Sequence, residues 1–249
     1  MQLQDILFSQ GFGTRRACAG LVQQGLVQIC QGDESPWPCL EAAREVAVEG
    51  LRIRVRGVDW PYHAKAYLML NKPAGIECSQ KPSSYPSVYT LLPSPLRMRP
   101  QKSAIQGVQA VGRLDQDTTG LLLLSDDGQF IHRMSSPKKQ LPKVYEAVLK
   151  HPIDDRQVLR LREGVVLDDD PMPVRAAACE IVDANAARVQ LRLTLTEGKY
   201  HQVKRMVAAV GNRVEALHRS RIGGLQLPPD LPSGQWRWLS PAEVAAITA

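Results

Sequence analysis

The sequence predicts an α+β protein in which a small N-terminal α/β module precedes a mostly antiparallel, mixed-sheet domain. Three observations support this class. The chain opens with two short helical patterns followed by strand patterns. The remainder consists mainly of strand-like apolar segments that do not alternate with helices, which argues against a βαβ array. With 249 residues, 44% of them apolar, the chain can bury the cores of one or two domains.

The first helix is expected close to the N-terminus. Leu3, Ile6 and Leu7 fall on one face at helical spacing. Gly11 or Gly13 is expected to end this helix, because glycine readily adopts the left-handed conformation that follows a helix. The segment therefore begins with a short amphipathic helix.

A second helix and two strands complete the first module. The helix is expected to begin after Thr14, whose hydroxyl can cap it, and to end at Gly25. Leu26–Ile29 is expected to be a short strand. Leu51–Arg56 alternates strictly between apolar and arginine side chains, which predicts a half-exposed strand with an arginine face.

The chain is expected to divide near Gly57. The predicted organisation is a module over residues 1–57, a linker over residues 58–63 and a larger domain over residues 64–249. Strands are expected in the larger domain at Ala66–Leu70, Leu121–Leu124, Val144–Leu149 and Ala187–Leu195.

Residues 79–109 are rich in proline, serine and basic side chains, and are expected to form a long loop region. A helix is expected over Tyr200–Val210, stopped by Gly211. A last helix is introduced by Ser240–Glu243, which supplies a cap, a proline at the first helical position and the glutamate of a capping box.

Charge and cysteine content narrow the class of protein. The formal net charge is +6, residues 1–57 contribute none of it, and the densest basic stretch is 199–221. This distribution suggests an anionic partner. No apolar run approaches the ~20 residues of a membrane helix and the start lacks a secretory pattern, so we expect a cytoplasmic protein without a membrane partner. The five cysteines form no C-x-x-C pair, which argues against a zinc ribbon or a disulfide scaffold.

The most informative stretch is Val111–Gly128, in which an arginine and two aspartates stand directly before four leucines. The leucines predict a buried strand, so Asp115 should lie in a loop at the edge of the core. One alternative is a plain turn capped by Asp117 and Thr118. A calcium loop is disfavoured because Asp126 replaces the glutamate of the twelfth position and leucines fill the positions between. No metal is expected.

Residues 112–124, Gly-Arg-Leu-Asp-x-Asp-Thr-x-Gly-Leu-Leu-Leu-Leu, resemble the catalytic motif of the pseudouridine synthases of the ribosomal small-subunit synthase A branch. Lys143–Tyr145 and Glu197–Asn212 match two further motifs, and all three occur in the family's order. Residues 1–57 look like the S4-type RNA-binding module that precedes the catalytic domain in this branch. The resemblance therefore covers nearly the whole chain and implies an S4-like module followed by a pseudouridine synthase domain.

The resemblance implies an isomerase that converts a uridine of 16S rRNA to pseudouridine. The residues at Tyr200–Val210 and His218–Gly224 look closest to those of the 16S enzyme. The family resemblance implies that the target is uridine 516. The reaction needs no metal, redox cofactor or ATP, but it needs a nucleophilic or charge-stabilising carboxylate beside the glycosidic bond. By the resemblance that residue is Asp115. The atom that it attacks is left open.

A carboxylate that stays ionised in a desolvated pocket needs a nearby cation. In the helix expected at 200–210, His201, Lys204 and Arg205 cluster opposite an apolar face. Without the motif, this basic face would be read as a solvated helix surface. By the resemblance Lys204 is the basic partner of Asp115, and Arg205 is the alternative.

The resemblance also assigns aromatic and RNA-binding residues. Tyr145, otherwise readable as a core tyrosine, would stack on a target base that has left its own stack. Arg113 would orient the motif loop or contact the RNA. The remaining residues expected to bind RNA are Arg15, Arg16, His201, Arg205, Arg219 and Arg221. The N-terminal module departs from the family pattern, because it has no net positive charge and carries a longer loop over residues 30–43.

Two other functions fit less well. One is the same chemistry on 23S rRNA or tRNA. The other is a non-catalytic rRNA-binding factor for ribosome assembly, which the intact set of Asp115, Tyr145 and Lys204 argues against. The expected partner is 16S rRNA or a small-subunit assembly intermediate, and the expected oligomeric state is a monomer.

Overall fold

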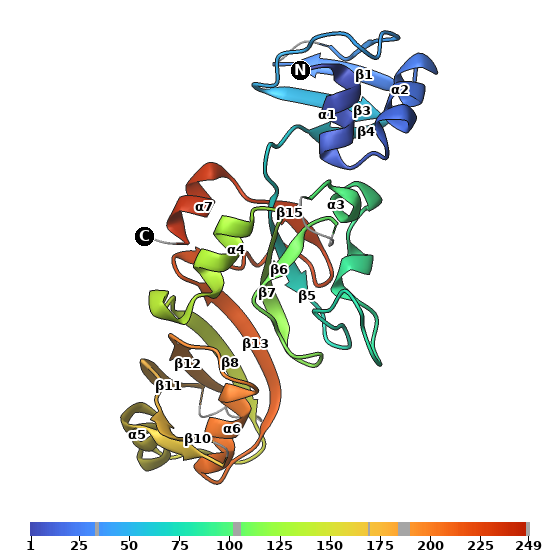
Figure 1. Cartoon of the computed structure of the whole chain (residues 1–249). Helices are drawn as coiled ribbons and strands as arrows, with labels where there is room; N and C mark the ends of the chain where they lie inside the picture. Colours follow the sequence, from blue (N-terminus) through green and yellow to red (C-terminus); the bar gives the residue numbers. More distant parts are fainter. Residues whose placement is uncertain (33–34, 102–105, 169, 184–189, 248–249) are drawn as a thin grey trace. The chain divides into compact units, whose positions relative to one another are not determined.

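The computed structural model describes residues 1–32, 35–101, 106–168, 170–183 and 190–247 (Figure 1). The chain forms two compact units, which are considered separately below. Unit 1 comprises Met1–Ala66, Leu92–Gln109 and Ser125–Asp127, and unit 2 comprises Tyr67–Leu91, Ala110–Leu124 and Gly128–Ala249. Among the described helices, none combines the length and the apolar character that spanning a bilayer requires.

The described residues of unit 1 form three helices and a four-stranded antiparallel sheet. The strand order is β2-β1-β3-β4. Its core contains fully buried Ile6, Val22 and Ile53. The bounds are α1 Leu3–Gln10, α2 Arg15–Gln23, β1 Val27–Gln31, β2 Trp37–Pro38, β3 Leu51–Val55, β4 Val58–Pro61 and α3 Ser94–Met98.

The predicted helix signals of unit 1 are confirmed. The backbone N–H of Ala17 donates to the Thr14 hydroxyl over 3.2 Å, which caps α2. Gly11, rather than Gly13, ends α1 in the left-handed conformation at φ 88°. A side chain at Gly11 would collide with the carbonyl oxygen of Pro95. Glycine therefore both ends α1 and lets α3 approach it closely.

Residues 58–61 are a strand, so the predicted linker over 58–63 is wrong for most of its length. Arg56 and Gly57 both have positive φ, 51° and 82°, as a type I′ hairpin turn requires. The chain turns back and β4 pairs with β3. Trp60 on β4 is only 6% exposed. The physical reason is that burial of this indole fixes the segment to the sheet, which a free linker would not do.

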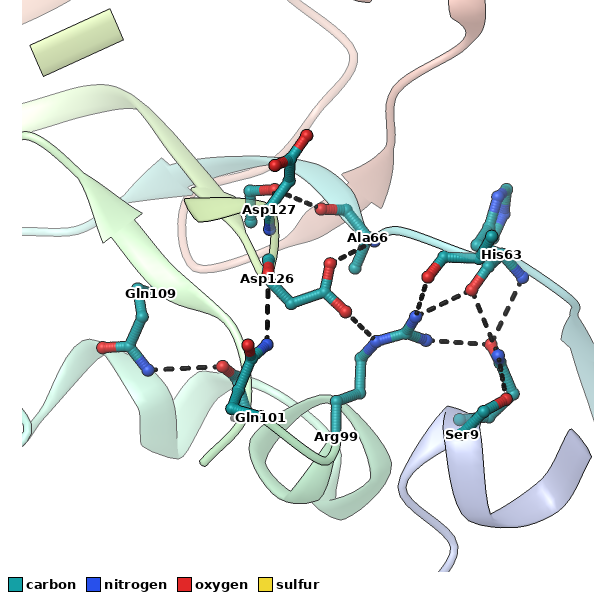
Figure 2. A network of polar contacts seen from close by, with 12 residues as sticks. Ser9, His63, Ala66, Arg99, Gln101, Gln109, Asp126 and Asp127 are labelled. Carbon is teal, nitrogen blue, oxygen red and sulfur yellow. Dashed lines mark hydrogen bonds and ion pairs between the residues drawn. The ribbon is translucent and has the colours of Figure 1, made fainter. Parts of the chain in front are cut away.

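A buried ion pair ties together the separate segments of unit 1 (Figure 2). Arg99 is 1% exposed, and its Nε donates to Asp126 Oδ2 over 2.6 Å. Its other nitrogens donate to Gln10 Oε1 over 2.9 Å and to the His63 carbonyl over 2.7 Å. Asp126 Oδ1 in turn accepts from the Ala66 backbone N–H over 2.7 Å. The guanidinium and the carboxylate thus each hold backbone and side chains from distant parts of the sequence.

The long loop predicted over 79–109 is only partly a loop. It contains η1, Val88–Leu91, the helix α3, and the start of β6, Gln109–Val111. Leu96 and Val108 are fully buried. These apolar side chains fix much of the segment in place, and Lys102, which contributed to its basic character, lies outside the described residues.

Unit 2 is built on a large mixed sheet in the order β11-β12-β8-β13-β7-β5-β15 (Figure 1). In addition, β14 pairs with β13, and β6 pairs with β7. β13 pairs in parallel with β7 and antiparallel with β8. The predicted α+β class with a mostly antiparallel, mixed sheet is confirmed. The strands of this sheet are β5 Tyr67–Lys72, β6, β7 Thr119–Ser125, β8 Lys143–Leu149, β11 Ala178–Asp183, β12 Gln190–Leu195, β13 Val214–Ile222, β14 Leu225–Gln226 and β15 Trp236–Trp238.

Two hydrophobic clusters lie among the described residues of unit 2. One includes Leu193 of β12 and Met206 of the helix over Gln202–Ala209, and the other includes Leu121 of β7 and Phe130 of the helix over Gly128–Ser135. The remaining elements of unit 2 are α4 Gly128–Ser135, η2 Pro137–Lys139, α5 Asp155–Glu163, β9 Val165–Leu167, β10 Asp170–Val174, α6 Gln202–Ala209 and α7 Pro241–Ala246.

Most predicted elements of unit 2 are present with shifted ends. The strand expected over Ala187–Leu195 is described from Gln190, and Ala187–Val189 lie outside the described residues. The helix expected over Tyr200–Val210 begins only at Gln202, because His201 adopts a left-handed conformation, φ 47°, at its N-cap position.

The predicted capping box of the last helix is confirmed and extended by an ion pair. The Glu243 N–H donates to Ser240 Oγ, and the Ser240 N–H donates to Glu243 Oε2. Arg237 also donates to both carboxylate oxygens of Glu243 over 2.6 and 2.9 Å. Its hydrogen bond lowers the pKa of Glu243 from 4.5 to about 2, although burial opposes this.

This ion pair predicts a defined acid response. Because the pKa of Glu243 is lower in the folded chain, its stabilising contribution is complete above pH 4.5 and is lost as the pH falls towards about 2. Glu243→Gln keeps the cap but removes the charge. The difference in thermal unfolding temperature between wild type and this variant should shrink over that range. Glu41→Gln, at an exposed site, should show no such convergence, and a pH-independent difference for Glu243→Gln would refute the assignment.

Candidate active site

The site is built around the loop between β6 and β7, which carries Asp115. Lys72, at the end of β5, is fully buried against this loop. Its Nζ donates to the carbonyls of Gln116 over 3.1 Å, of Thr118 over 3.0 Å and of Pro73 over 3.0 Å. Three acceptors match the three donors of an ammonium group. Lys72 therefore fixes the loop backbone on both sides of Asp117.

Burial lowers the pKa of Lys72, while the nearby thiol and carboxyl groups raise it. Replacing Lys72 by methionine should leave three carbonyls without their donor. We expect the free energy of unfolding to fall by roughly 2–5 kcal/mol. Turnover should fall tenfold or more, because a displacement of about 1 Å in a reacting group can cost ~100-fold. Lys81→Met, at an exposed site, is the matched control. If both variants retain wild-type stability and turnover, Lys72 does not position the loop.

Asp115 has two basic neighbours. Lys204 Nζ lies 3.4 Å from Asp115 Oδ2, and His201 Nε2 lies 3.5 Å from Asp115 Oδ1. Lys204 is bound more closely by Asp117, to which it donates over 2.6 and 2.9 Å. Asp115 therefore has a cation beside it without a short hydrogen bond from that cation. Its oxygens stay available to a substrate.

Asp117 is the member of this cluster that holds Lys204. Burial raises the pKa of Asp117, but the hydrogen bond and the charge of Lys204 outweigh burial, so this pKa lies below its ordinary value. Arg205, the alternative partner of Asp115, instead donates to the Tyr200 carbonyl over 3.1 Å. Within the described part of the chain, the ion pairs of Asp115 are those with Lys204 and His201.

Strand register places Tyr145 beside Arg219. Tyr145 of β8 is directly opposite Arg219 of β13, so both side chains lie on the same face of the sheet. Arg219 Nη1 donates to the Tyr145 hydroxyl over 3.5 Å, and its guanidinium carbon lies 6.0 Å from the ring centroid. The pairing shifts by one residue just after Arg219, as in a β-bulge, a feature that often occurs next to active sites.

Gly120 brings the start of β7, directly after the loop that carries Asp115, against β13. Its φ is 102°, and a side chain there would collide with the carbonyl oxygen of Arg219. Thr119 and Gly120 pair in parallel with His218 and Arg219. The glycine that follows the two aspartates in the sequence is thus required for the close approach of the two strands.

A pocket of about 90 Å³ opens where these elements meet. Asp115 and Tyr145 line it, and Leu195, Val203 and Leu217 supply apolar side chains. It combines a carboxylate, an aromatic ring and an apolar wall. That composition suits a flat, partly polar group such as a nucleobase.

The other predicted residues occupy different positions. Arg113 is exposed and lines the pocket with Asp115. Arg221 is exposed on β13, and its Nε donates to the Gly223 carbonyl. Arg15 and Arg16 are exposed in unit 1, where Arg15 pairs with Asp5 over 2.8 Å. The structure therefore brings Asp115, Tyr145, Lys204, His201 and Arg113 together.

Arg219 is the predicted residue whose setting differs most from a surface phosphate contact. It is only 3% exposed, and its Nε donates to the Leu121 carbonyl over 2.9 Å. It lines a cavity of about 170 Å³, through which a contact with RNA would have to be made. Its buried position follows from the pairing of β13 between β7 and β8.

Sequence patterns did not identify the roles of Lys72 and Asp117. The sequence assigns Asp117 only to a turn or to the disfavoured calcium loop, and the Asn71-Lys72-Pro73 sequence indicates only where a strand ends. A lysine directly after an apolar strand was the available signal for Lys72. The alternative of a calcium loop is excluded for Asp126, because this carboxylate is bound to Arg99.

Comparisons with known proteins show what the sequence and the fold are similar to. A family model described as RNA pseudouridylate synthase matches residues 66–209. The Ribosomal small subunit pseudouridine synthase A of Escherichia coli (strain K12) is 42% identical over 245 residues, which cover 98% of each chain. That of Salmonella typhimurium is 37% identical over the same coverage. A crystal structure of a pseudouridylate synthase is similar with a TM-score of 0.66 and 33% identity, over 99% of both chains.

Proposed function

Because the chain belongs to the RNA pseudouridylate synthase family, we propose that it converts one uridine of small-subunit ribosomal RNA, 16S rRNA, to pseudouridine. The relatives that carry this substrate in their names are similar over nearly the whole chain, which supports the substrate. The match at Tyr200–Val210 and His218–Gly224 favours 16S rRNA, and the position that we propose, uridine 516, is the one that the family resemblance implies.

Asp115 is proposed as the catalytic residue. The isomerisation breaks the bond between N1 of the base and C1′ of the sugar, turns the base and joins C5 to C1′. A carboxylate at this point can attack the substrate or balance developing positive charge. The observation that carries the proposal is the position of Asp115, in the same pocket as Tyr145 and 3.4 Å from Lys204.

The neighbouring residues are assigned supporting roles. Lys204 offsets the cost of keeping Asp115 ionised in a partly buried pocket. Tyr145 stacks on the flipped base, and its hydroxyl is the proposed proton carrier for C5. Arg113, at the edge of the pocket, contacts the RNA beside the target nucleotide. His201, Arg205 and the N-terminal Arg15 and Arg16 are proposed as further RNA contacts.

The activity can be tested on defined RNA. Purified protein is incubated with 16S transcript labelled with tritium at C5 of uridine. Because C5 loses its hydrogen when it joins the sugar, isomerisation should release one tritium per RNA to the solvent, and mapping should place one pseudouridine. Release from 23S rRNA or tRNA instead would overturn the substrate. Binding without any release on these RNAs or on small-subunit assembly intermediates would indicate a non-catalytic rRNA-binding factor.

Binding to RNA should depend steeply on salt. Each phosphate that is neutralised adds roughly 0.7–0.9 to the slope of log affinity against log salt concentration. Replacing the exposed Arg221 by alanine should lower that slope by the contribution of about one phosphate contact. Arg156→Ala, on α5, is the matched control. Equal slopes for wild type and Arg221→Ala would assign Arg221 to structure rather than to RNA.

The partner and the location follow from the substrate. We infer that the enzyme works as a monomer in the cytoplasm, on rRNA or on an assembling small subunit.

A further inference from the structure

Tyr145 lines a second cavity besides the pocket of Asp115. This cavity has a volume of about 170 Å³, and it shares Arg113, Tyr145, Glu197 and Gly198 with the pocket of Asp115. Tyr145 therefore faces both spaces. Cavities that enclose whole small molecules measure roughly 300–1,000 Å³. This one is smaller, so it suits a single chemical group adjoining whatever occupies the pocket of Asp115.

The lining of this cavity is basic. Arg113, Lys143 and Arg219 contribute three positive charges and Glu197 one negative charge, which leaves two positive charges in excess. The carboxylate of Glu197 already accepts a hydrogen bond from Gln202 over 2.6 Å. No ion pair to Lys143 or Arg219 is present among the described residues. Within the described residues, therefore, no carboxylate neutralises Lys143 or Arg219, and the cavity stays positively charged.

Arg219 is the most buried of these cations. Two of its nitrogens donate to the Leu121 carbonyl and to the Tyr145 hydroxyl, and its Nη2 has no hydrogen-bond partner among the residues that the structure describes. Burying a charge is costly unless the charge is paired. An anion in the adjoining cavity would offset that cost. Without such an anion, Nη2 of Arg219 keeps no acceptor within the described residues.

The surroundings of Lys143 also favour an anion as the ligand. Its Nζ donates to the Leu141 carbonyl over 3.1 Å. Burial lowers the pKa of Lys143, and the charge of Arg219 lowers it further. Two neighbouring cations that repel each other bind an anion more favourably than either does alone.

The remaining polar lining fits a phosphate group. Ser135, Ser136 and Thr196 place hydroxyl donors around the cavity. Guanidinium, ammonium and hydroxyl groups together are a typical donor set for phosphate oxygens. We propose that this cavity binds one phosphodiester group of the substrate RNA next to the target uridine. The proposal rests on the function above, since it places the flanking backbone while Tyr145 holds the base.

This site would have a specific use in the reaction. After the glycosidic bond breaks, the base must turn while the ribose stays in position. A phosphate bound by Arg219, which also contacts Tyr145, would keep the ribose next to the freed base. The same residue, Arg219, would contact the phosphate and the hydroxyl of Tyr145 and so set their spacing.

The test uses an RNA that the wild-type enzyme modifies. The phosphates that flank the target uridine are replaced one at a time by uncharged methylphosphonates, and kcat/KM for pseudouridine formation is measured. One replacement should lower the wild-type value roughly tenfold to hundredfold. Lys143→Gln should lower it similarly on unmodified RNA and show no further loss with that methylphosphonate. Lys150→Gln, at an exposed site in the same unit, should behave as wild type.

Two outcomes would overturn the site. Every flanking methylphosphonate could affect wild type and Lys143→Gln equally, or none could affect wild type at all. Lys143→Arg, which keeps the charge, should restore sensitivity to the methylphosphonate, and this variant decides the case if the glutamine variant fails to fold. Failure of the proposed function is distinguishable, because wild type would then form no pseudouridine in the unmodified RNA.

Discussion

Asp115→Asn should abolish pseudouridine formation while RNA affinity stays within a few-fold of wild type. Asparagine keeps the size of the side chain, but its neutral amide can neither attack the substrate nor balance positive charge. Removal of a nucleophile from an enzyme typically costs more than ~10³-fold in turnover. Affinity should persist because one carboxylate contributes no phosphate contact. The measurements are single-turnover kinetics and equilibrium binding to the same RNA.

Asp117→Asn is the matched control for this experiment. It removes an equal charge two residues away, and it frees Lys204 from its bonds of 2.6 and 2.9 Å. Lys204 can then move closer to Asp115. We expect a reduction of roughly tenfold, well short of the loss at Asp115. If Asp115→Asn turns over like wild type, or if both variants are affected equally, Asp115 is not the residue that carries the chemistry.

Arg99→Met should have the largest effect on stability. It leaves Asp126, 6% exposed, as a buried carboxylate without its cation, and it also removes donors from Gln10 and His63. Breaking a buried ion pair by removal of one partner costs about 3–5 kcal/mol, against a total of about 5–15 kcal/mol for a typical domain. Denaturant titration should detect this loss. Arg97→Met, at an exposed position of α3 two residues before Arg99, should change little.

The same contacts revise the expected behaviour of a truncated chain. Two-part organisation alone predicts that residues 64–249 fold independently. Arg99 binds Gln10 and His63, which that fragment lacks, and Leu96 belongs to the same unit as Met1–Ala66. We therefore expect rapid proteolysis within residues 92–101 of the fragment. If Arg99→Met is as stable as wild type and the fragment resists protease, the buried pair does not hold unit 1 together.

Local signals in the sequence predicted local structure well. Thr14 and the Ser240–Glu243 capping box are confirmed, and Gly11 is one of the two glycines expected to end the first helix, because a helix end depends on a few adjacent residues. The strand of four leucines and the aspartates before it also located the candidate site, because a polar cluster that interrupts an apolar run stands out.

Features that depend on distant residues could not be predicted in this way. The hairpin before β4 requires positive φ at Arg56, a residue type that seldom adopts it, and the burial of Trp60 depends on the rest of the unit. Arg219 stands in a polar stretch that reads as exposed, yet its strand lies between two others. Lys72 and Arg99 act through partners more than twenty residues away along the chain.

Mapping of pseudouridines in 16S rRNA tests the central claim most directly. The RNA is taken from a strain that lacks the gene, and from the same strain carrying a plasmid copy of wild type or of Asp115→Asn. We expect one pseudouridine, at uridine 516, to be absent from the deletion strain, restored by the wild-type copy and not restored by the asparagine variant. A full pseudouridine pattern in the deletion strain, or restoration by Asp115→Asn, would contradict the account.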